Sequence, residues 1–210
     1  MNTTQTLKNR MVLTTAFVLS FNAQSLSAQA ELAPMRPDLR LKHARELLGD
    51  AYKNSPAPRS AGLVSVTRFV YNVIQTKMDV KYRAHAANLS ATILNESSRR
   101  GLDPIFVLAV IATESQFNPT VIGTSGEIGL MQVKPDTARW IAQKEGIVFK
   151  GAATLKNPMV NVRIGIAYMS YLRGKFEGSA NRYVAAYNMG PANVRRHIAQ
   201  ATTPREYATR

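Results

Sequence analysis

Three features of the sequence predict an all-α protein. Apolar residues recur at helical spacing in most segments of the chain. Asp103-Pro104 and Asn157-Pro158 are helix start signals, because the acid or amide side chain can cap free backbone N–H groups while proline suits the first helical turn. Gly101 and Gly146 follow helical stretches, where a left-handed C-cap is expected. With 210 residues and no cysteine, we expect about one domain, stabilised by its core without disulfides.

The first 30 residues are expected to form a secretory signal peptide. Lys8 and Arg10 precede the apolar run MVLTTAFVLSF, and Ala28-Gln29-Ala30 provides a small-x-small cleavage site. A membrane anchor is the alternative, but about eleven apolar-leaning residues are few against the roughly 20 that a spanning helix needs. We therefore expect cleavage after Ala30, export from the cytoplasm, and no integral membrane segment in the mature chain.

The charge of the chain favours an anionic partner. Without Lys8 and Arg10, 25 of the 27 basic residues remain against 13 acidic ones, a net charge of +12. Nucleic acid is disfavoured by the export signal and by the lack of a basic stretch interleaved with aromatic residues. A carboxylate-rich cell wall or anionic lipid suits the compartment better. The alternative, that the charge serves only solubility, stays open.

Residues 31–78 are expected to form a helical N-terminal segment or docking arm. The pattern LRLKHARELLGDAY at 39–52 predicts one amphipathic helix. The prolines of NSPAPRSAG break it, and 62–77 then predicts a mostly apolar helix, with a strand as the alternative. The residues expected to face inward from the first helix are Leu41, Ala44, Leu47, Leu48 and Ala51.

The next two helices are predicted from apolar spacing and caps. Residues 83–100 place Ala86, Leu89 and Ile93 on one face, with Ala87 and Leu94 beside them. The apolar run IFVLAVIATES, at 105–115, is also compatible with a buried strand. Its length and the start signal before it favour a helix that ends before Asn118-Pro119.

The remaining chain predicts one structured loop and four helices. Three glycines in 121–133 indicate a structured loop that leads to a short apolar segment. Helices are expected over 135–146, 159–176, 179–190 and 191–200. Trp140 lies on an amphipathic pattern and is expected in the core, with a sugar-stacking role as the alternative.

Glu114 stands out because a carboxylate follows an uninterrupted apolar run. On a helix it shares a face with Val107, Val110 and Ile111, so its side chain lies against aliphatic neighbours. Apolar surroundings and a position at the helix C-terminus both favour the neutral, protonated form. Such a group can serve as a general acid. The alternative is that Glu114 only marks the point where the helix meets solvent.

Three ordered motifs resemble the soluble lytic transglycosylase family. They are Glu114-Ser115-x-Phe117-Asn118-Pro119, Gly126-x-x-Gly129-Leu130-Met131-Gln132 and Ala186-Tyr187-Asn188-x-Gly190-Pro191. The resemblance covers about 82–200, and Asn157-Pro158, Asn161, Gly165 and Tyr168 also fall where that family has asparagine, glycine and tyrosine landmarks. Agreement of three motifs in order is more specific than any one of them.

This resemblance implies a lysozyme-like helical domain over 79–210 with a sugar-binding cleft and Glu114 as the catalytic residue. It implies periplasmic cleavage of the MurNAc–GlcNAc bond of peptidoglycan, with a 1,6-anhydro end on the product. Glu114 would act first as acid and then as base, assisted by the substrate's own N-acetyl group. The residues expected to contact substrate are Gln132, Met131, Tyr187, Asn188 and Ser125.

The chain departs from the family at two positions near Glu114. Gly123 stands where the family often has a serine that contacts sugar, and Ser125 is the candidate to replace that serine. Glu127 stands where alanine is common, and we expect it to face solvent because unpaired charges are rarely buried. If Glu127 entered the cleft, it could position a water and turn the reaction towards hydrolysis.

Two other functions remain open from sequence. One is a lysozyme-like muramidase, and the other is a largely structural wall-binding component of an envelope-spanning secretion or conjugation apparatus. No cofactor motif is present, and His43, His85 and His197 share no metal-ligand spacing, so neither a cofactor nor a metal is expected.

Overall fold

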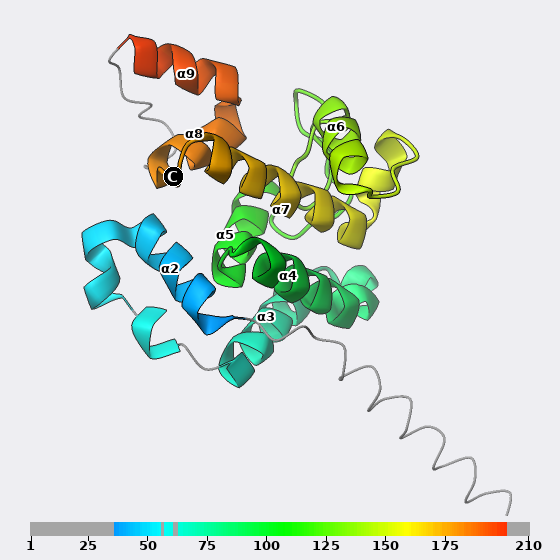
Figure 1. The fold of residues 1–210 in the computed structure, drawn as a ribbon. Helices are drawn as coiled ribbons and strands as arrows, with labels where there is room; N and C mark the ends of the chain where they lie inside the picture. The colour runs from blue at the N-terminus through cyan, green and yellow to red at the C-terminus, as the bar shows by residue number, and fades with distance from the viewer. Residues whose placement is uncertain (1–35, 56, 61–62, 201–210) are drawn as a thin grey trace, which may run out of the picture. The chain divides into compact units, whose positions relative to one another are not determined.

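A computed structural model describes residues 36–55, 57–60 and 63–200 (Figure 1). Within these ranges the regular elements are helices, so the all-α prediction is confirmed. Two isolated β-bridges, from Ile128 to Ile122 and from Ile128 to Val133, lie in the loop between α5 and α6. The proposed signal peptide lies outside the described residues. The α-helices are α2 (Pro37–Leu48), α3 (Leu63–Lys77), α4 (Ala86–Arg100), α5 (Pro104–Ser115), α6 (Pro135–Glu145), α7 (Pro158–Lys175), α8 (Ala180–Met189) and α9 (Pro191–Ala199). Short 3-10 helices span Gly49–Asn54, Ala57–Ser60, Val80–His85 and Ala152–Lys156.

Helix α4 lies at the centre of the core, where it packs against α3, α5 and α7 (Figure 1). Its residues Ala86, Leu89, Ile93 and Leu94 are buried as predicted, whereas Ala87 is exposed and the expectation for it was wrong. The 3.6-residue period identifies the centre of a helix face well, but a residue at the edge of the face is decided by the neighbouring helices.

The segment 62–77 forms a helix, and the strand alternative is wrong. Val66, Val70 and Ile74 on α3 and Met78 directly after it are all buried, at intervals of four residues. This spacing places their side chains on one face, against α4 and α5. The described part of 31–78 therefore shares the core of the helices that follow it.

Helix α2 buries a different face from the predicted one. The residues that α2 buries are Arg40, His43 and Ala44. Among the residues expected to face inward, Leu48 is 41% exposed and Ala51, just past the helix end, is also exposed. Leu41 and Leu47 are half-buried. Of the five residues expected to face inward, only Ala44 is buried. The polar partners of Arg40 and His43, which lie far along the chain, determine which face is buried.

Those partners are Asp103 and Tyr183. Arg40 Nε lies 3.2 Å from Asp103 Oδ1 in a buried ion pair. His43 Nδ1 accepts a hydrogen bond from the backbone N–H of Asp103 at 2.9 Å, and its Nε2 lies 3.1 Å from the Tyr183 hydroxyl. Because Nδ1 is an acceptor, the neutral ring carries its proton on Nε2 and donates it to Tyr183.

Burial, above all, keeps His43 neutral. Its pKa is lowered to about 4, chiefly by burial and also by nearby Arg173, while Glu46 acts in the opposite direction. Arg173 itself forms a fork on Glu46, with N–O distances of 2.6 to 3.2 Å. These contacts attach α2 to the start of α5 and to α7 and α8.

The predicted caps are confirmed. Asp103 accepts a hydrogen bond from Ile105 N at 3.0 Å, and Asn157 caps α7 in the same way. Gly101 and Gly146 are left-handed, with φ of 64° and 65°. Local chemistry thus determines where these helices begin and end.

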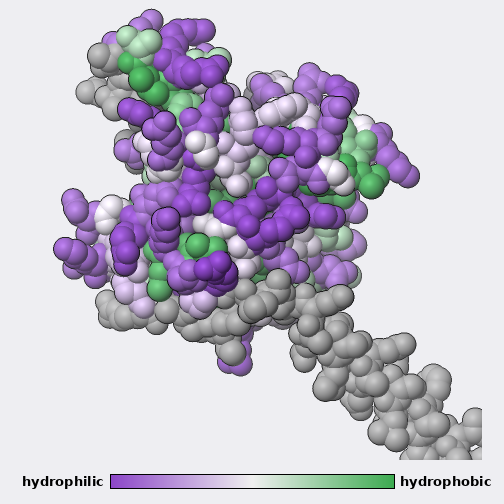
Figure 2. All heavy atoms as spheres, viewed as in Figure 1, coloured by the Kyte–Doolittle hydropathy of each residue, from purple (hydrophilic) through white to green (hydrophobic). Residues whose placement is uncertain are grey.

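Figure 2 shows a largely hydrophilic face on which hydrophobic residues form small separate areas, one of them over α9. No described helix has the length and sustained hydropathy that a membrane-spanning segment requires.

Trp140 is 42% exposed, so the prediction that it lies in the core was wrong.

Candidate active site

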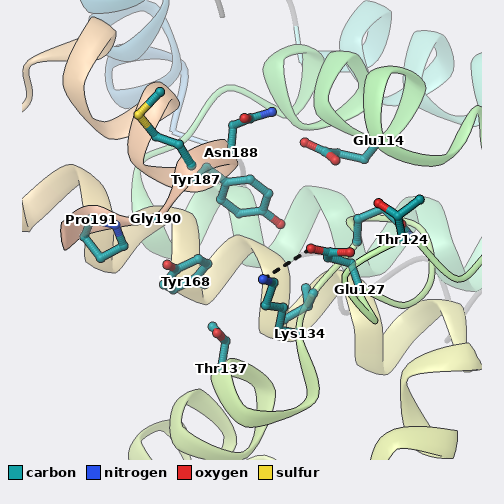
Figure 3. A pocket seen from close by; sticks show the side chains of 14 residues that line it. Glu114, Thr124, Glu127, Lys134, Thr137, Tyr168, Tyr187, Asn188, Gly190 and Pro191 are labelled. Atoms are coloured by element: carbon teal, nitrogen blue, oxygen red, sulfur yellow. Dashed lines mark ion pairs between the residues drawn. The ribbon is translucent and has the colours of Figure 1, made fainter. Parts of the chain in front are cut away.

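A pocket of about 450 Å³ lies where the end of α5, the loop 121–133, the start of α6, the middle of α7 and the α8–α9 junction meet (Figure 3). This volume is in the range of pockets that hold small ligands or segments of polymers. Its lining residues are Glu114, Gly123, Thr124, Glu127, Gln132, Val133, Lys134, Thr137, Tyr168, Tyr187, Asn188, Met189, Gly190 and Pro191.

Glu114 occupies the last turn of α5, as predicted. Val107, Val110 and Ile111, on the same helix, are buried in the core, while Glu114 is half-buried and its carboxyl group points into the pocket (Figure 3). The helix ends directly after it because Gln116 adopts a left-handed conformation, with φ of 50°. The apolar run thus places a carboxyl group at the pocket wall with aliphatic packing behind it.

Ser115, the next residue, connects α5 to the loop of the second motif. Its hydroxyl is buried and lies 2.8 Å from the carbonyl oxygen of Leu130 and 3.1 Å from that of Ile111. A hydroxyl has one proton, so it donates to one of these carbonyls at a time. The pair Glu114-Ser115 therefore combines a pocket residue with a residue that holds the pocket wall.

Asn161 on α7 holds the same loop from the other side. It is fully buried, its Oδ1 accepts from Met131 N at 2.8 Å, and its Nδ2 donates to the carbonyls of Ile128 (2.7 Å) and Leu155 (3.0 Å). A Cβ on Gly129, which has φ of 82°, would collide with the Asn161 side chain. Asn161 and Gly129 therefore serve one function: they determine the backbone path of the loop.

The structure brings Gln132, Tyr187 and Asn188 together with Glu114 around the pocket. Whether they contact substrate stays a prediction. The Tyr187 hydroxyl donates to the carbonyl oxygen of Met131 at 2.8 Å. Gln132, left-handed with φ of 45°, donates from Nε2 to the carbonyls of Gly129 (2.9 Å) and Val121 (3.3 Å). Gln132 is therefore expected to offer a substrate its carbonyl oxygen.

Two predicted contact residues do not line the pocket. Met131 is fully buried, and its sulfur packs where Gly165 has no room for a Cβ, so Met131 contributes packing rather than pocket surface. Ser125 is exposed outside the lining, and its backbone N–H donates to Glu127 Oε2 at 3.0 Å. The structure therefore does not place Ser125 where it could replace the serine missing at Gly123.

Glu127 lines the pocket, so the prediction that it faces solvent was wrong. Its side chain is 24% exposed, and Lys134 Nζ lies 3.5 Å from its Oε1 (Figure 3). Solvent exposure is expected of an unpaired charge, but the Glu127 carboxylate pairs with Lys134. Figure 3 shows the carboxyl groups of Glu114 and Glu127 pointing into the same space.

Gly123 makes room for Glu127. A Cβ at position 123 would lie 2.7 Å from both Glu127 Oε2 and Gln132 Oε1, closer than real Cβ contacts. The carboxylate thus occupies space next to position 123 that any side chain there would need. The two departures from the family pattern, at 123 and 127, are therefore sterically linked in this chain.

Sequence reasoning did not predict Lys134, Thr137 and Tyr168 as pocket residues. Lys134 and Thr137 lie at the start of α6, a few residues after Gln132. Their nearness in sequence to Gln132, a predicted pocket residue, was the signal that could have identified them. Tyr168 was noted only as a landmark. Burial raises the pKa of its hydroxyl, and the neighbouring Tyr171 raises it further, so Tyr168 stays a neutral hydrogen-bonding group.

The described residues hold no group of three or more His, Asp or Glu side chains arranged to bind a metal ion. The carboxylates that line the pocket are Glu114 and Glu127. The chemistry that this arrangement supports is proton transfer and hydrogen bonding to a polar ligand.

Comparisons with known proteins agree with the motifs. A family model described as transglycosylase SLT domain matches residues 91–209. Membrane-bound lytic murein transglycosylase C of Histophilus somni is 36% identical over 115 residues, which cover 50% of this chain and 31% of that protein. Endo-type membrane-bound lytic murein transglycosylase A of Klebsiella pneumoniae is 40% identical over 92 residues, which cover 41% of this chain and 44% of that protein.

Among solved structures, an inactive mutant of lytic transglycosylase Slt from Pseudomonas aeruginosa is 26% identical, with a TM-score of 0.49. The match covers 79% of this chain and 32% of that one. The chain thus spans less than half the length of each of these relatives.

Proposed function

Because the chain belongs to the transglycosylase SLT domain family, we propose that it is a lytic transglycosylase that cleaves the MurNAc–GlcNAc β-1,4 bond of peptidoglycan and leaves 1,6-anhydro-MurNAc ends. One observation carries the proposal. Residues from three separate motifs, Glu114, Gln132, and the pair Tyr187 and Asn188, line a single pocket.

In the proposed mechanism Glu114 acts twice. As an acid it protonates the glycosidic oxygen, so the bond from C1 of MurNAc to that oxygen breaks and GlcNAc leaves as an alcohol. The substrate's N-acetyl oxygen stabilises the positive charge at C1, as in other substrate-assisted glycosidases. Glu114, now a carboxylate, accepts the proton of the C6 hydroxyl as O6 bonds to C1. The proton balance closes, and no water is consumed.

The surroundings of Glu114 suit the first, acidic step. The aliphatic face of α5 and the C-terminal end of its dipole favour a neutral carboxyl group. The Tyr187 hydroxyl donates its proton to Met131 O, so towards Glu114 its oxygen can act only as an acceptor. An acceptor beside a carboxyl group favours the protonated form, and we propose this as the role of Tyr187.

Digestion of purified peptidoglycan, with mass spectrometry of the products, tests the reaction. We expect anhydro-MurNAc ends from the wild-type chain and loss of at least about a hundredfold in rate with Glu114→Gln, because the amide cannot transfer the proton. Reducing MurNAc ends without anhydro ends would contradict the proposal.

A muramidase that admits water is the second candidate, and the position of Glu127 favours it. Its carboxylate lines the pocket that Glu114 lines, and a second carboxylate is what hydrolytic glycosidases use to activate water. The ion pair with Lys134 holds the Glu127 side chain at one wall of the pocket. If Glu127 positions water, Glu127→Gln will raise the ratio of anhydro to reducing ends, whereas an unchanged ratio excludes this role.

Export and service to an envelope-spanning secretion or conjugation apparatus stay predictions. The basic charge and the family support a site of action in the cell wall. Glu114→Gln separates a catalytic from a structural role in such an apparatus. Retained biological function without lytic activity would favour the structural, wall-binding role.

A further inference from the structure

A row of side chains on α7 leads out of the pocket. Tyr168 lines the pocket, Tyr171 follows one turn later, and Lys175 lies one further turn along. Residues at this spacing share one face of a helix. Each is at least partly exposed.

Helix α6 carries a matching row and packs against α7. Thr137 lines the pocket, Trp140 lies three residues on, and Lys144 follows four residues after Trp140. Both helices thus present a pocket residue, then an aromatic residue, then a lysine. Because α6 and α7 both carry a pocket residue, an aromatic residue and a lysine in this order, the arrangement belongs to the surface that the two helices form together and does not depend on one exposed side chain.

The aromatic rings of these helices form a continuous row with the pocket. The ring of Tyr187 lies 5.5 Å from that of Tyr168, which stacks with Tyr171 at 6.4 Å and an interplanar angle of 14°. Tyr171 meets Trp140 edge to face at 4.7 Å. We call these four residues the aromatic row; it extends from the pocket to a Trp140 that is 42% exposed.

Two lysines lie on the outer part of the aromatic row. Lys144 Nζ is 4.9 Å from the centre of the Tyr171 ring and 5.7 Å from that of Trp140. Lys175 Nζ is 3.2 Å from the Tyr171 hydroxyl. Within the described part of the chain, neither lysine takes part in a salt bridge, so a carboxylate of a ligand would be the first to pair with them.

We propose that the aromatic row and these two lysines form an accessory binding surface for a peptidoglycan strand that extends out of the pocket. Tyrosine and tryptophan have an apolar body and a polar tip, which suits the faces and hydroxyls of sugars. Lys144 and Lys175 would pair with the carboxylates of stem peptides, in agreement with the basic charge of the chain. The inference rests on the proposed function only for the identity of the polymer.

Binding of the full-length chain to insoluble peptidoglycan tests the surface without catalysis. In a Glu114→Gln background, we expect Trp140→Ala and Lys144→Gln each to raise the Kd for the wall roughly threefold to tenfold. Phe69→Ala removes an aromatic ring of similar exposure, 47%, on α3, and Arg139→Gln removes a charge from a different face of α6, five residues before Lys144. Both control variants are expected to bind like the parent chain.

Glycan strands stripped of their peptides separate the two parts of the surface. Hydrolysis of the peptide amide frees the lactyl carboxylate of MurNAc, so these strands are used with that carboxyl group converted to its amide. The loss caused by Lys144→Gln should then disappear, because no carboxylate remains, whereas the loss caused by Trp140→Ala should remain. Trp140→Tyr should bind almost as well as the parent chain. This result would show that Trp140→Ala weakens binding because the aromatic ring is lost and not because the fold is disturbed.

The inference is overturned if Trp140→Ala and Lys144→Gln bind intact wall like their parent, or if the Phe69→Ala and Arg139→Gln controls weaken binding equally. These binding results do not depend on which product ends are formed. Failure of the proposed reaction and failure of the accessory surface are therefore distinguishable.

Discussion

The hydroxyl of Ser115 lies 2.8 Å from the carbonyl oxygen of Leu130, and this contact joins the end of α5 to the loop of the second motif. Glu114 is the residue before Ser115, and Gln132 is two residues after Leu130. One buried hydrogen bond thus sets the distance between two walls of the pocket. Ser115 is accordingly a positioning residue.

Removal of this hydroxyl should affect turnover as well as stability. We expect Ser115→Ala to lower the free energy of unfolding by about 1–2 kcal/mol, because a buried carbonyl loses its donor. It should also lower kcat on peptidoglycan more than it changes KM. Thr113→Ala is the matched control, since Thr113 bonds to Ala109 O on the exposed side of the same helix. Equal effects of the two variants on kcat would show that Ser115 has no positioning role.

The coupling of Gly123 to Glu127 predicts a rescue. Gly123→Ser should destabilise the loop, because its Cβ would lie 2.7 Å from both Glu127 Oε2 and Gln132 Oε1. Adding Glu127→Ala removes the first of these contacts and should recover part of the loss, with a coupling energy of about 1–2 kcal/mol in a double-mutant cycle of unfolding free energies. Gly174→Ser, at a helical glycine with open space around it, is the control that should show no coupling to Glu127. Additive effects of Gly123→Ser and Glu127→Ala would contradict the steric explanation.

Asn161 should be among the most sensitive positions near the pocket. Asn161→Ala leaves Met131 N and the carbonyls of Ile128 and Leu155 without their partner, so we expect a loss of about 3 kcal/mol or more in unfolding free energy. Chemical denaturation measures this loss. Asn181→Ala, at an exposed position on α8, should change it by less than about 0.5 kcal/mol. A loss of similar size in both variants would contradict the bonding role of Asn161.

His43 predicts a specific pH dependence of stability. The native state holds its pKa at about 4, below the ordinary 6.5, so between these values the unfolded chain binds a proton that the folded chain does not. The free energy of unfolding should therefore fall as pH drops from 6.5 to about 4, by up to about 3 kcal/mol, and this contribution should level off below pH 4.

The comparison of wild type with His43→Gln isolates that contribution. Glutamine can still accept the hydrogen bond from Asp103 N but does not titrate. Burial raises the pKa of Asp103, which acts in the opposite sense, yet Asp103 is present in both chains. His85→Gln, at an exposed histidine, is the control that should keep the wild-type pH profile. A wild-type profile in His43→Gln would show that His43 is not the titrating group.

Helix boundaries were predictable because caps act through their own neighbours in the chain. Asp103, Asn157, Gly101 and Gly146 each interact with groups a few residues away, so their roles follow from sequence. The position of Glu114 was predictable for the same reason. It needs only an apolar run and the point where that run ends.

The side chains that were predicted incorrectly depend on partners far along the chain. Arg40 and His43 are buried because they pair and hydrogen-bond with Asp103 and Tyr183. The helical period of the sequence does not predict such distant partners. Glu127 enters the pocket because Gly123 leaves space and Lys134 supplies the opposite charge. Met131 is buried because Gly165 leaves room for its sulfur.

The sequence by itself determined the all-α class, the helix ends that carry a cap, the family and the residue at the centre of the proposed reaction. It did not determine the end of α2 at Leu48 or the start of α4 at Ala86, where 3-10 helices continue the predicted segments. Only the tertiary structure decided which residues of the motifs face the pocket, that Glu127 joins them, and that Trp140 belongs to a row leading out of it. The physical reason is the separation along the chain between the interacting residues. Caps and periodicity act within a few residues, whereas pocket lining, ion pairing and room for a side chain depend on segments brought together by folding.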